Sequence, residues 1–528
     1  MKFLFATRNL PLTRFNNIMN IFYIVIIGLF LYNIDKACVC YIWANKNEVG
    51  NAMYRVFSLI CVLSLLMASV SCVSDDNDVV TTNESSQSEV ETTELFTVEI
   101  KDFDNYDFRF YTYSTGVDMY APEEETGDIV NDAVYRRNRE IEEMYNITIS
   151  TIDSGTLNER EHRDAINTMI NAGDEACDVV LNIGKQLANQ ALDGYYINMY
   201  DIEEFDFDKS WWSKQLVEDL SFSGCMYFCS NNLHYEEFAA SKVFYFNKDK
   251  IDEYQLDDPY ELVLSGKWVI NRMIEMTRDV NEDLNGNNIA DNEDFYGLLT
   301  TVSHNAWAVC FDIPVWEKNN DSIELVAMSD KMLNAFDKIH SWYYDSIGLY
   351  TWDSYSKAIN EMRDMFKAGQ GMFVFGFVGD SGTYYRDTDV DYGIVPFPKY
   401  DENQENYRVF FGANTSNMFA IPIFASDKSR TGLILEALSA KGYEELIPVY
   451  YEVALKDKYM RDETSVEILD IITENRTISF SYCYDNWDAG LGFGNCFQSE
   501  FKDSFSTFYA ARENIVKSRI QKVVEAFT

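Results

Sequence analysis

An oxygen-rich segment, residues 283–294, has the sequence DLNGNNIADNED. Its first, third, fifth, ninth and twelfth positions carry side-chain oxygens and its seventh would offer a backbone carbonyl: Asp283, Asn285, Asn287, Asp291, Asp294 and Ile289. This is the spacing with which a calcium loop of the EF-hand kind surrounds a hard cation. Asn288 stands where a glycine is usual but tolerates the left-handed backbone conformation, and Asp294 replaces the usual glutamate. The segment predicts a structural Ca²⁺ site that braces a loop; the alternative is an Asx-rich surface turn without metal.

Motifs of common hydrolytic and phosphate-binding enzymes do not occur in the sequence. It contains no G-x-S-x-G elbow, no H-E-x-x-H and no G-x-x-x-x-G-K, and its four histidines are scattered. Because the chain has 86 acidic residues, some carboxylates must lie close together, so their number is no evidence for a glycosidase pair. The sequence favours binding without catalysis, and we expect that the protein is not an enzyme.

The segment from Met53 to Cys72, MYRVFSLICVLSLLMASVSC, has the features of an export signal. Its apolar core is too short to span a bilayer, and small residues precede the cysteine. It resembles a bacterial lipoprotein signal at residues 53–71, in which Cys72 would carry the lipid. Ser69 stands where this kind of signal usually has leucine, so the alternative is ordinary cleavage without lipid. We expect a protein at the cell surface, lipid-anchored to the outer face of the cytoplasmic membrane.

The regions on either side of this signal have different compositions. Residues 1–52 contain a second apolar patch upstream of the signal, which is unusual, and we interpret them as a non-native extension with translation starting at or near Met53. The alternative is a genuine N-terminal membrane anchor. Residues 72–95 are rich in Ser, Thr, Asn and carboxylates, which predicts a disordered tether. The folded body then spans residues 96–528.

Charge and cysteine content limit the partners. Residues 1–71 hold six basic and two acidic side chains, so the remaining chain carries a net charge of −47 against −43 for the whole. This balance argues against nucleic acid as a partner. Six cysteines follow Cys72 without the spacing of a zinc site. Buried free thiols are the favoured interpretation, with Cys225–Cys229 and Cys483–Cys496 as alternative disulfides.

Strand and helix patterns alternate at the start of the body. Strands are predicted at 108–113, 147–151 and 178–183, and helices at 132–145 and 160–172. This order predicts an α/β fold with a parallel sheet and right-handed crossovers.

Several segments together resemble one protein family. They are YRRNREIEEMYNITI, GDEACDVVLN, VFYFNKDKIDEYQLDDPYELVLSGKW, FKAGQGMFVFGF, YGIVPFPK and MFAIPIFASDKSRTGLILEAL. In this order and spacing they are similar to the extracellular solute-binding proteins, family 1, of bacterial ABC importers, over essentially all of residues 97–528. The late segment GYEELIPVYYEVALKDKYMRDETSVEILDII resembles importer lipoproteins of Gram-positive anaerobes.

The resemblance implies a two-lobed periplasmic-binding-protein-like fold (type II), with the ligand cleft between two α/β lobes. Segments 243–249 and 392–399 are the candidate crossings between lobes. Closure around the ligand would present a surface to an ABC permease in the membrane, and the chain is expected to act as a monomer.

The composition points to a ligand class. Aromatic rings stack on the C–H faces of sugars while carboxylates and amides bind hydroxyl groups, so an aromatic, acidic cleft suits a neutral carbohydrate, such as an oligosaccharide. The alternatives are the same fold binding peptide or another polar solute, a secreted carbohydrate-active enzyme, and a surface adhesin.

Individual ligand-binding residues are assigned from type and position. Phe377 matches a position where the family segment commonly carries a ligand-facing aromatic. Trp307 and Trp352 are candidate stacking platforms, with packed core or lobe surface as the alternative. His234 and Glu237 are candidates for lining the cleft, against an ordinary surface loop. The pair Trp211 and Trp212 is predicted to be a structural anchor beneath a loop.

Overall fold

The computed structural model describes residues 98–528 except 115, 354, 413–415, 452–461 and 486–489, and gives no side chains for 355–357. The account below concerns the unit formed by residues 93–528. The predicted extension, export signal, Cys72 anchor and tether lie outside the described residues. None of the described helices has the length and apolar character needed to cross a bilayer.

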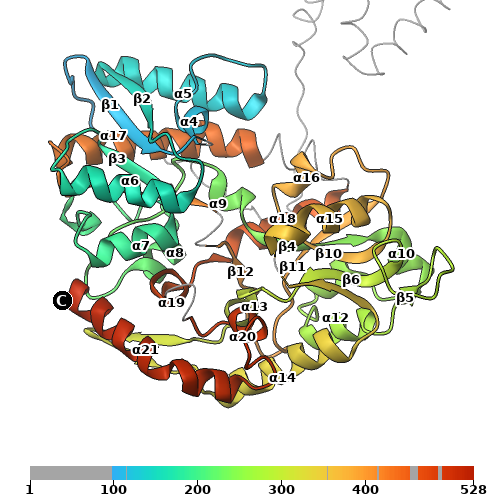
Figure 1. Ribbon diagram of the computed structural model, residues 1–528. Helices are drawn as coiled ribbons and strands as arrows, with labels where there is room; N and C mark the ends of the chain where they lie inside the picture. The colour runs from blue at the N-terminus through green and yellow to red at the C-terminus, as the bar shows by residue number, and fades with distance from the viewer. Residues whose placement is uncertain (1–97, 115, 354, 413–415, 452–461, 486–489) are drawn as a thin grey trace, which may run out of the picture. The chain divides into compact units, whose positions relative to one another are not determined.

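The first sheet has the strand order β13-β3-β1-β2. Strand β1 (Tyr106–Thr112) pairs in parallel with β2 (Ile147–Asp153) and β3 (Val179–Ile183), and β13 (Asn417–Ala420) runs antiparallel to β3. Helices α5 (Ile129–Tyr145) and α6 (Glu159–Asn171) connect the parallel strands. The predicted alternation of strand and helix is therefore confirmed. Below, this sheet and the helices packed on it are called the first lobe (Figure 1).

Local chemistry fixes the ends of these connecting helices. The Asp128 carboxylate accepts hydrogen bonds from the first-turn amides of α5, and Asn146 ends that helix in the left-handed conformation with φ 49°. Asn158 caps α6 in the same way as Asp128 caps α5. Such caps satisfy amides that have no partner within the helix. They explain why the helices stop where the next strand begins.

The second sheet has the order β11-β4-β10-β6-β5, and β9 also pairs with β6, along the residues that follow those paired with β5. Strand β4 (Lys242–Asn247) runs antiparallel to β10 (Gly371–Phe377) and β11 (Tyr392–Pro396), while β10 and β9 (Leu349–Trp352) are parallel to β6 (Phe295–Thr301). Strand β5 (Asn281–Glu282) pairs with the start of β6. This sheet and its helices form the second lobe (Figure 1).

The remaining elements complete both lobes and the C-terminal region. They are α4 (Val117–Tyr120), α7 (Gly184–Leu192), α8 (Lys214–Leu220), α9 (Glu236–Ala239), α10 (Lys248–Glu253), α11 (Pro259–Leu264), α12 (Ile270–Thr277), α13 (Ala306–Cys310), β7 (Trp316–Asn319), β8 (Ser322–Leu325), α14 (Asp330–Asp345), α15 (Tyr355–Lys367), α16 (Asp380–Thr383), β12 (Val409–Phe410), α17 (Lys428–Lys441), α18 (Glu463–Glu474), β14 (Arg476–Thr477), α19 (Phe480–Tyr484), α20 (Phe493–Phe497) and α21 (Phe505–Phe527), with short helical turns at Met199–Asp201 and Gly442–Leu446.

The chain passes from one sheet to the other next to the ends of two strands, β4 and β11, which the sequence analysis assigned to crossings. Segments 243–249 and 392–399 contain β4 and β11, which pair with each other inside the second sheet. The first passage therefore lies just before β4, after α9, and the second lies between β11 and β13. On this second passage β12 pairs in parallel with β14 from the C-terminal region. Both passages therefore lie next to the segments assigned to crossings.

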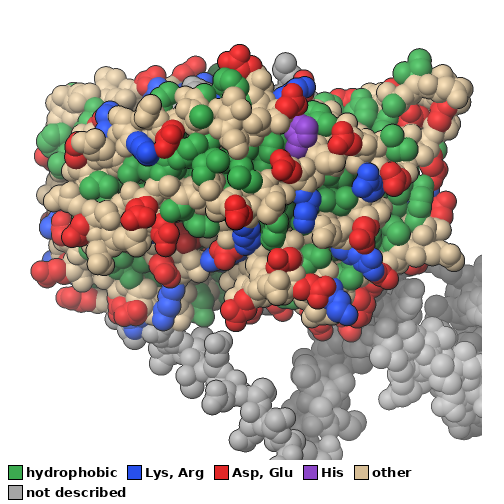
Figure 2. Space-filling model, turned by 90° about the horizontal axis from the view of Figure 1, so that it is seen from below, with side chains coloured by type: hydrophobic (Ala, Val, Ile, Leu, Met, Phe, Trp, Pro, Cys, Tyr) green, Lys and Arg blue, Asp and Glu red, His purple; other side chains and the backbone are tan. Residues whose placement is uncertain are grey.

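A single cluster of buried apolar side chains includes residues of both sheets. Its largest fully buried members include Trp268, Trp307, Phe108 and Phe244. Helix α21 adds to this link because it contacts α7 of the first lobe and α14 of the second. On the face in Figure 2, acidic and basic side chains are interspersed with apolar ones.

Two expectations about structural residues can be compared with the fold. Trp211 and Trp212 are buried, and both indole N–H groups donate to the Glu436 carboxylate of α17, at 2.8 and 3.0 Å. The predicted anchor is confirmed. The six cysteines of the described residues form no disulfide with one another, and only Cys225 is partly exposed.

Candidate ligand-binding site

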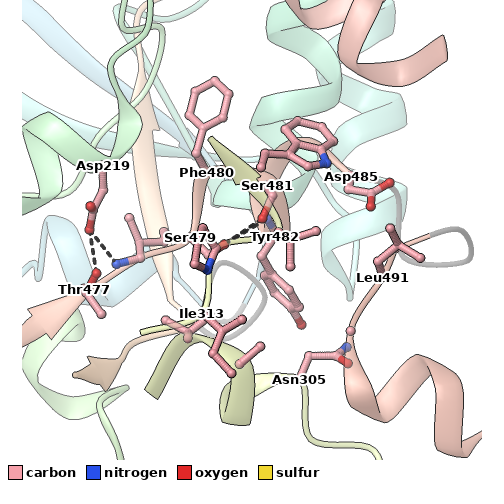
Figure 3. A pocket seen from close by; sticks show the side chains of 18 of the residues that line it. Asp219, Asn305, Ile313, Thr477, Ser479, Phe480, Ser481, Tyr482, Asp485 and Leu491 are labelled. Carbon is pink, nitrogen blue, oxygen red and sulfur yellow. Dashed lines mark hydrogen bonds between the residues drawn. The ribbon is translucent and has the colours of Figure 1, made fainter. Parts of the chain in front are cut away.

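A cavity of about 380 Å³ lies between elements of the two lobes (Figure 3). This volume is within the range of small-molecule sites, roughly 300–1,000 Å³. Its walls come from α7 and α8, from α13 and the chain that follows it, from β7, and from the C-terminal segment. The lining residues are Lys185, Asp219, Asn305, Ala308, Val309, Asp312, Ile313, Pro314, Val315, Trp316, Lys318, Arg408, Thr477, Ile478, Ser479, Phe480, Ser481, Tyr482, Asp485, Gly490, Leu491, Gly492 and Asn495.

Asp219 holds the C-terminal segment against the first lobe. Its carboxylate accepts hydrogen bonds from the Thr477 hydroxyl at 2.7 Å and from the Ile478 amide at 3.0 Å (Figure 3). Burial raises the pKa of Asp219, while these hydrogen bonds oppose the shift. A carboxylate with its lone pairs engaged in this way positions the wall of the cavity.

Lys318 of β7 joins the β7–β8 hairpin to the first lobe. Its Nζ donates to the backbone carbonyls of Glu218, Asp219 and Ser221 at 2.8, 2.9 and 2.8 Å. These are the carbonyls at the C-terminal end of α8, where an ammonium group is electrostatically favoured. The hairpin and α8 therefore form one continuous wall.

Hydroxyl, amide and aromatic groups make up much of the remaining lining. Asn305 and Asn495 form two hydrogen bonds with each other. The Asn305 side-chain amide donates to the Asn495 side chain at 3.1 Å, and the Asn305 side-chain oxygen accepts from the Asn495 backbone N–H at 3.2 Å. Trp316 is 6% exposed, and its indole N–H has no hydrogen-bond partner among the described residues. A buried indole N–H normally has a partner, so Trp316 offers an unused donor at the cavity wall.

Three solved structures are similar to this chain in fold. An ABC substrate-binding protein from Listeria monocytogenes, in complex with cycloalternan, matches with a TM-score of 0.51 and 14% identity over 79% of this chain and 100% of that chain. A cyclo/maltodextrin-binding protein in complex with maltotetraose matches with a TM-score of 0.55 and 11% identity over 79% and 97%. An extracellular solute-binding protein from Staphylococcus aureus in complex with maltose gives 0.53 and 10% over 79% and 98%.

The chain has the fold of the extracellular solute-binding proteins. The expected two-lobed fold (type II) is thereby confirmed, with helices and strands matched over most of the body. No protein-family model and no curated protein matches the sequence.

Within this solute-binding fold, Phe377 lies at the end of β10 and is partly exposed. Its backbone N–H donates to the Asp380 carboxylate at 3.1 Å, and its ring meets Phe375 edge-on with 5.6 Å between centroids. Phe377 belongs to the second lobe and is not part of the cavity lining. Its assignment as a ligand-facing aromatic stays a prediction.

The two candidate tryptophans occupy different environments. Trp307 is 0% exposed, donates its indole N–H to the Tyr343 hydroxyl at 2.7 Å and packs against Phe397 with ring centroids 4.8 Å apart. It is a core residue, and this corrects its assignment as a stacking platform. Trp352 is partly exposed, and its indole N–H donates to the Glu361 carboxylate at 2.9 Å. It does not line the cavity, and its assignment as a stacking platform stays a prediction.

His234 and Glu237 are buried side chains of the first lobe and its crossing. The His234 ring lies between the rings of Tyr120 and Tyr235, with centroid distances of 4.7 and 4.2 Å. Burial, and secondarily the nearby Arg137, lower the pKa of His234 to about 3. Glu237 is 1% exposed and pairs with Arg476 at 3.1 Å. Neither residue lines this cavity, and their assignment to the cleft wall stays a prediction.

A polar chain that the sequence interpretation missed lies where three elements of the first lobe meet. The Tyr113 hydroxyl donates to the Asn417 side chain at 3.4 Å, and the Asn417 amide donates to Glu236 at 3.3 Å. Tyr120 also donates to Glu236, at 2.5 Å. Burial raises the pKa of Glu236 to about 7. The three segments are distant in sequence, so only the fold brings these groups together.

The oxygen-rich loop is held by its own side chains. The Asp283 carboxylate accepts from the backbone amides of Gly286 and Asn288, and Asp291 accepts from the Asn287 amide at 2.8 Å. Asn288 has φ 59°, so the argument that asparagine can replace the turn glycine is confirmed. Within the described ranges, no three His, Cys, Asp or Glu side chains converge on a metal-binding arrangement. The oxygens needed for Ca²⁺ are present on one loop, and calcium stays a prediction.

Proposed function

We propose that this protein is the extracellular substrate-binding component of an ABC importer, which binds a carbohydrate between its lobes and delivers it to a membrane permease. The observation that carries this proposal is the interlobe cavity, whose lining combines the aromatic rings of Trp316, Phe480 and Tyr482 with many hydroxyl and amide groups. Sugars match such a lining because they combine apolar ring faces with many hydroxyl groups.

The solved neighbours support the same ligand class. Three proteins of this fold are bound to cycloalternan, maltotetraose and maltose. They are binding proteins, which also supports binding without catalysis here. The signal-like segment ending at Cys72 supports a lipid-anchored protein on the outer face of the membrane, where a permease would receive the ligand.

Isothermal titration calorimetry of residues 73–528 against mono- and oligosaccharides tests the proposal. One-to-one binding without turnover of the sugar is expected, together with a melting temperature that rises with ligand concentration. The Trp316→Phe variant should bind more weakly, because it loses the indole N–H while keeping an aromatic ring. Release of shorter sugars would instead support a carbohydrate-active enzyme, and binding of peptides alone would contradict the ligand class.

A further inference from the structure

Lys242, the first residue of β4, is a buried charge without a counter-charge. It is 6% exposed, and its side chain has neither an ion pair nor a hydrogen bond among the described residues. Its Nζ lies 4.5 Å from the centroid of the Phe410 ring. Lysine is rarely buried unless it is paired, because moving an ammonium group out of water is costly. A ring face compensates only part of that cost.

His304 lies next to Lys242 and also has an unused polar atom. It follows β6, is 5% exposed, and its Nε2 has no hydrogen-bond partner among the described residues. Burial, and secondarily the charge of Lys242, lower the pKa of His304 well below its ordinary value, so the ring is neutral. Burial lowers the pKa of Lys242 only to about 8, so the amine is largely protonated at neutral pH. The pair therefore carries a single positive charge.

Strand pairing puts an aromatic ring on the same face as this charge. Lys242 is directly opposite Phe377 in the antiparallel pair of β4 and β10, and Phe244 is opposite Phe375. Directly opposed residues project to the same side of a sheet. The His304 ring contacts Phe375 with 3.9 Å between centroids. Lys242, His304 and the partly exposed Phe377 thus form one group at the ends of β4, β6 and β10, called the lysine subsite below.

The lysine subsite adjoins the interlobe cavity. His304 precedes Asn305, which lines the cavity. The Phe410 ring that covers Lys242 meets the ring of Tyr482, another lining residue, with 5.3 Å between centroids. A ligand in the cavity that extends past Asn305 would meet the lysine subsite next.

We propose that the ligand is an acidic oligosaccharide, and that the lysine subsite takes the carboxylate of a uronate residue. This inference rests on the proposed carbohydrate-binding function. The carboxylate pairs with Lys242 Nζ, a sugar hydroxyl meets His304 Nε2, and the Phe377 ring packs on the sugar face. A carboxylate fits better than a phosphate, because one ammonium neutralises a monoanion and the neutral His304 adds no second charge.

Calorimetry with matched ligands tests the charge. The probes are trigalacturonate and an aldotriouronic acid that contains glucuronate, each as the free acid and as the methyl ester, with maltotriose and galactose 1-phosphate for comparison. We expect at least one free acid to bind roughly tenfold or more tightly than its ester, since a desolvated charge-assisted hydrogen bond is lost on esterification. Equal affinity of acid and ester, or tighter binding of the phosphate, would overturn the proposal.

Two variants assign the effect to a residue. Lys242→Gln should remove the preference for acid over ester, whereas Lys517→Gln, which removes a 57% exposed lysine of α21, should keep it. A preference that persists in Lys242→Gln would contradict the assignment. The pH dependence of the unmodified protein gives an independent measurement: the affinity for the acid should fall as pH rises above about 8, while the affinity for the ester stays level.

Failure of the inference and failure of the proposed function are distinguishable. Binding of maltotriose with no preference for acids would overturn the acidic ligand and keep the carbohydrate-binding function. Binding of none of the sugars by a folded protein would overturn both, and a thermal melt recorded beforehand shows whether each variant is folded.

Discussion

Arg363 of α15 and Asp380 of α16 form a buried ion pair, with Nη2 and Oδ1 2.6 Å apart. The other Asp380 oxygen accepts the backbone N–H of Phe377 at 3.1 Å. The pair therefore fixes the turn that carries Phe377, and the lysine subsite depends on it. Burial raises the pKa of Asp380 even though Arg363 acts in the opposite direction.

Removing the Asp380 carboxylate should destabilise the protein. In Asp380→Ala the Arg363 guanidinium stays buried without its partner, and breaking such pairs costs about 3–5 kcal/mol. We expect a lower denaturation midpoint in urea and weaker ligand binding. Asp364→Ala, a change at an exposed carboxylate of α15, is the control and should leave both unchanged. An unaltered midpoint in Asp380→Ala would show that the ion pair does not hold this turn.

Trp316 and Trp307 should respond differently to the same substitution. Trp316→Phe is expected to weaken sugar binding by about 1 kcal/mol, a typical value for a hydrogen bond, and also to lower the melting temperature, because the side chain is only 6% exposed. Trp307→Phe should lower the melting temperature, because it leaves a cavity and a buried Tyr343 hydroxyl without its indole donor. Calorimetry and thermal melts on both variants measure the two effects. Weaker sugar binding in Trp307→Phe but not in Trp316→Phe would contradict the assignment of the ligand contact to Trp316.

Glu436 should make stability depend on pH. Burial raises its pKa in the folded protein to about 7, against about 4.5 in an unfolded chain. The unfolded state then loses its proton first, so this contribution is present below pH 4.5 and is lost as pH rises to about 7. We expect a decrease of ~3 kcal/mol in the free energy of unfolding across this interval, measured by urea denaturation. Glu436→Gln should lack this component; an identical pH profile in the variant would rule out Glu436 as its source.

Calcium binding to the 283–294 loop should raise thermal stability. Ca²⁺ that binds only the folded state raises the melting temperature, because it stabilises that state by RT ln(1 + [Ca²⁺]/Kd), and chelation reverses the change. Asp291→Asn should abolish the shift, whereas Asp279→Asn, at a 79% exposed carboxylate just before the loop, should not. A melting temperature indifferent to Ca²⁺ in the unmodified protein would leave the loop as an Asx-rich turn held by its own hydrogen bonds.

The order of the elements could be predicted from sequence because it depends on local periodicity. The helix predicted at 132–145 and the strand at 178–183 correspond to α5 and β3 within a few residues. The strands β4 and β11 were assigned to crossings because apolar hinge strands and core strands have the same composition. Only their pairing with each other distinguishes them.

The environment of single side chains depends on distant segments and was less predictable. Trp307 occurs in a short helix after a polar loop, yet its indole is covered by Phe244, Tyr343 and Phe397. The unused N–H of Trp316 has no sequence signal at all. Lys242 does have a sequence signal, because a lysine at the start of an apolar strand is unusual and indicates a functional candidate.

The contact between Lys318 and α8 has a consequence for how the protein tolerates mutation. An ammonium group has three N–H donors, and all three here meet main-chain oxygens. Every amino acid supplies such an oxygen, so substitutions at 218, 219 or 221 that preserve the helix leave the contact intact. The contact therefore tolerates changes of sequence in α8, whereas a single exchange of Lys318 removes all three hydrogen bonds at once.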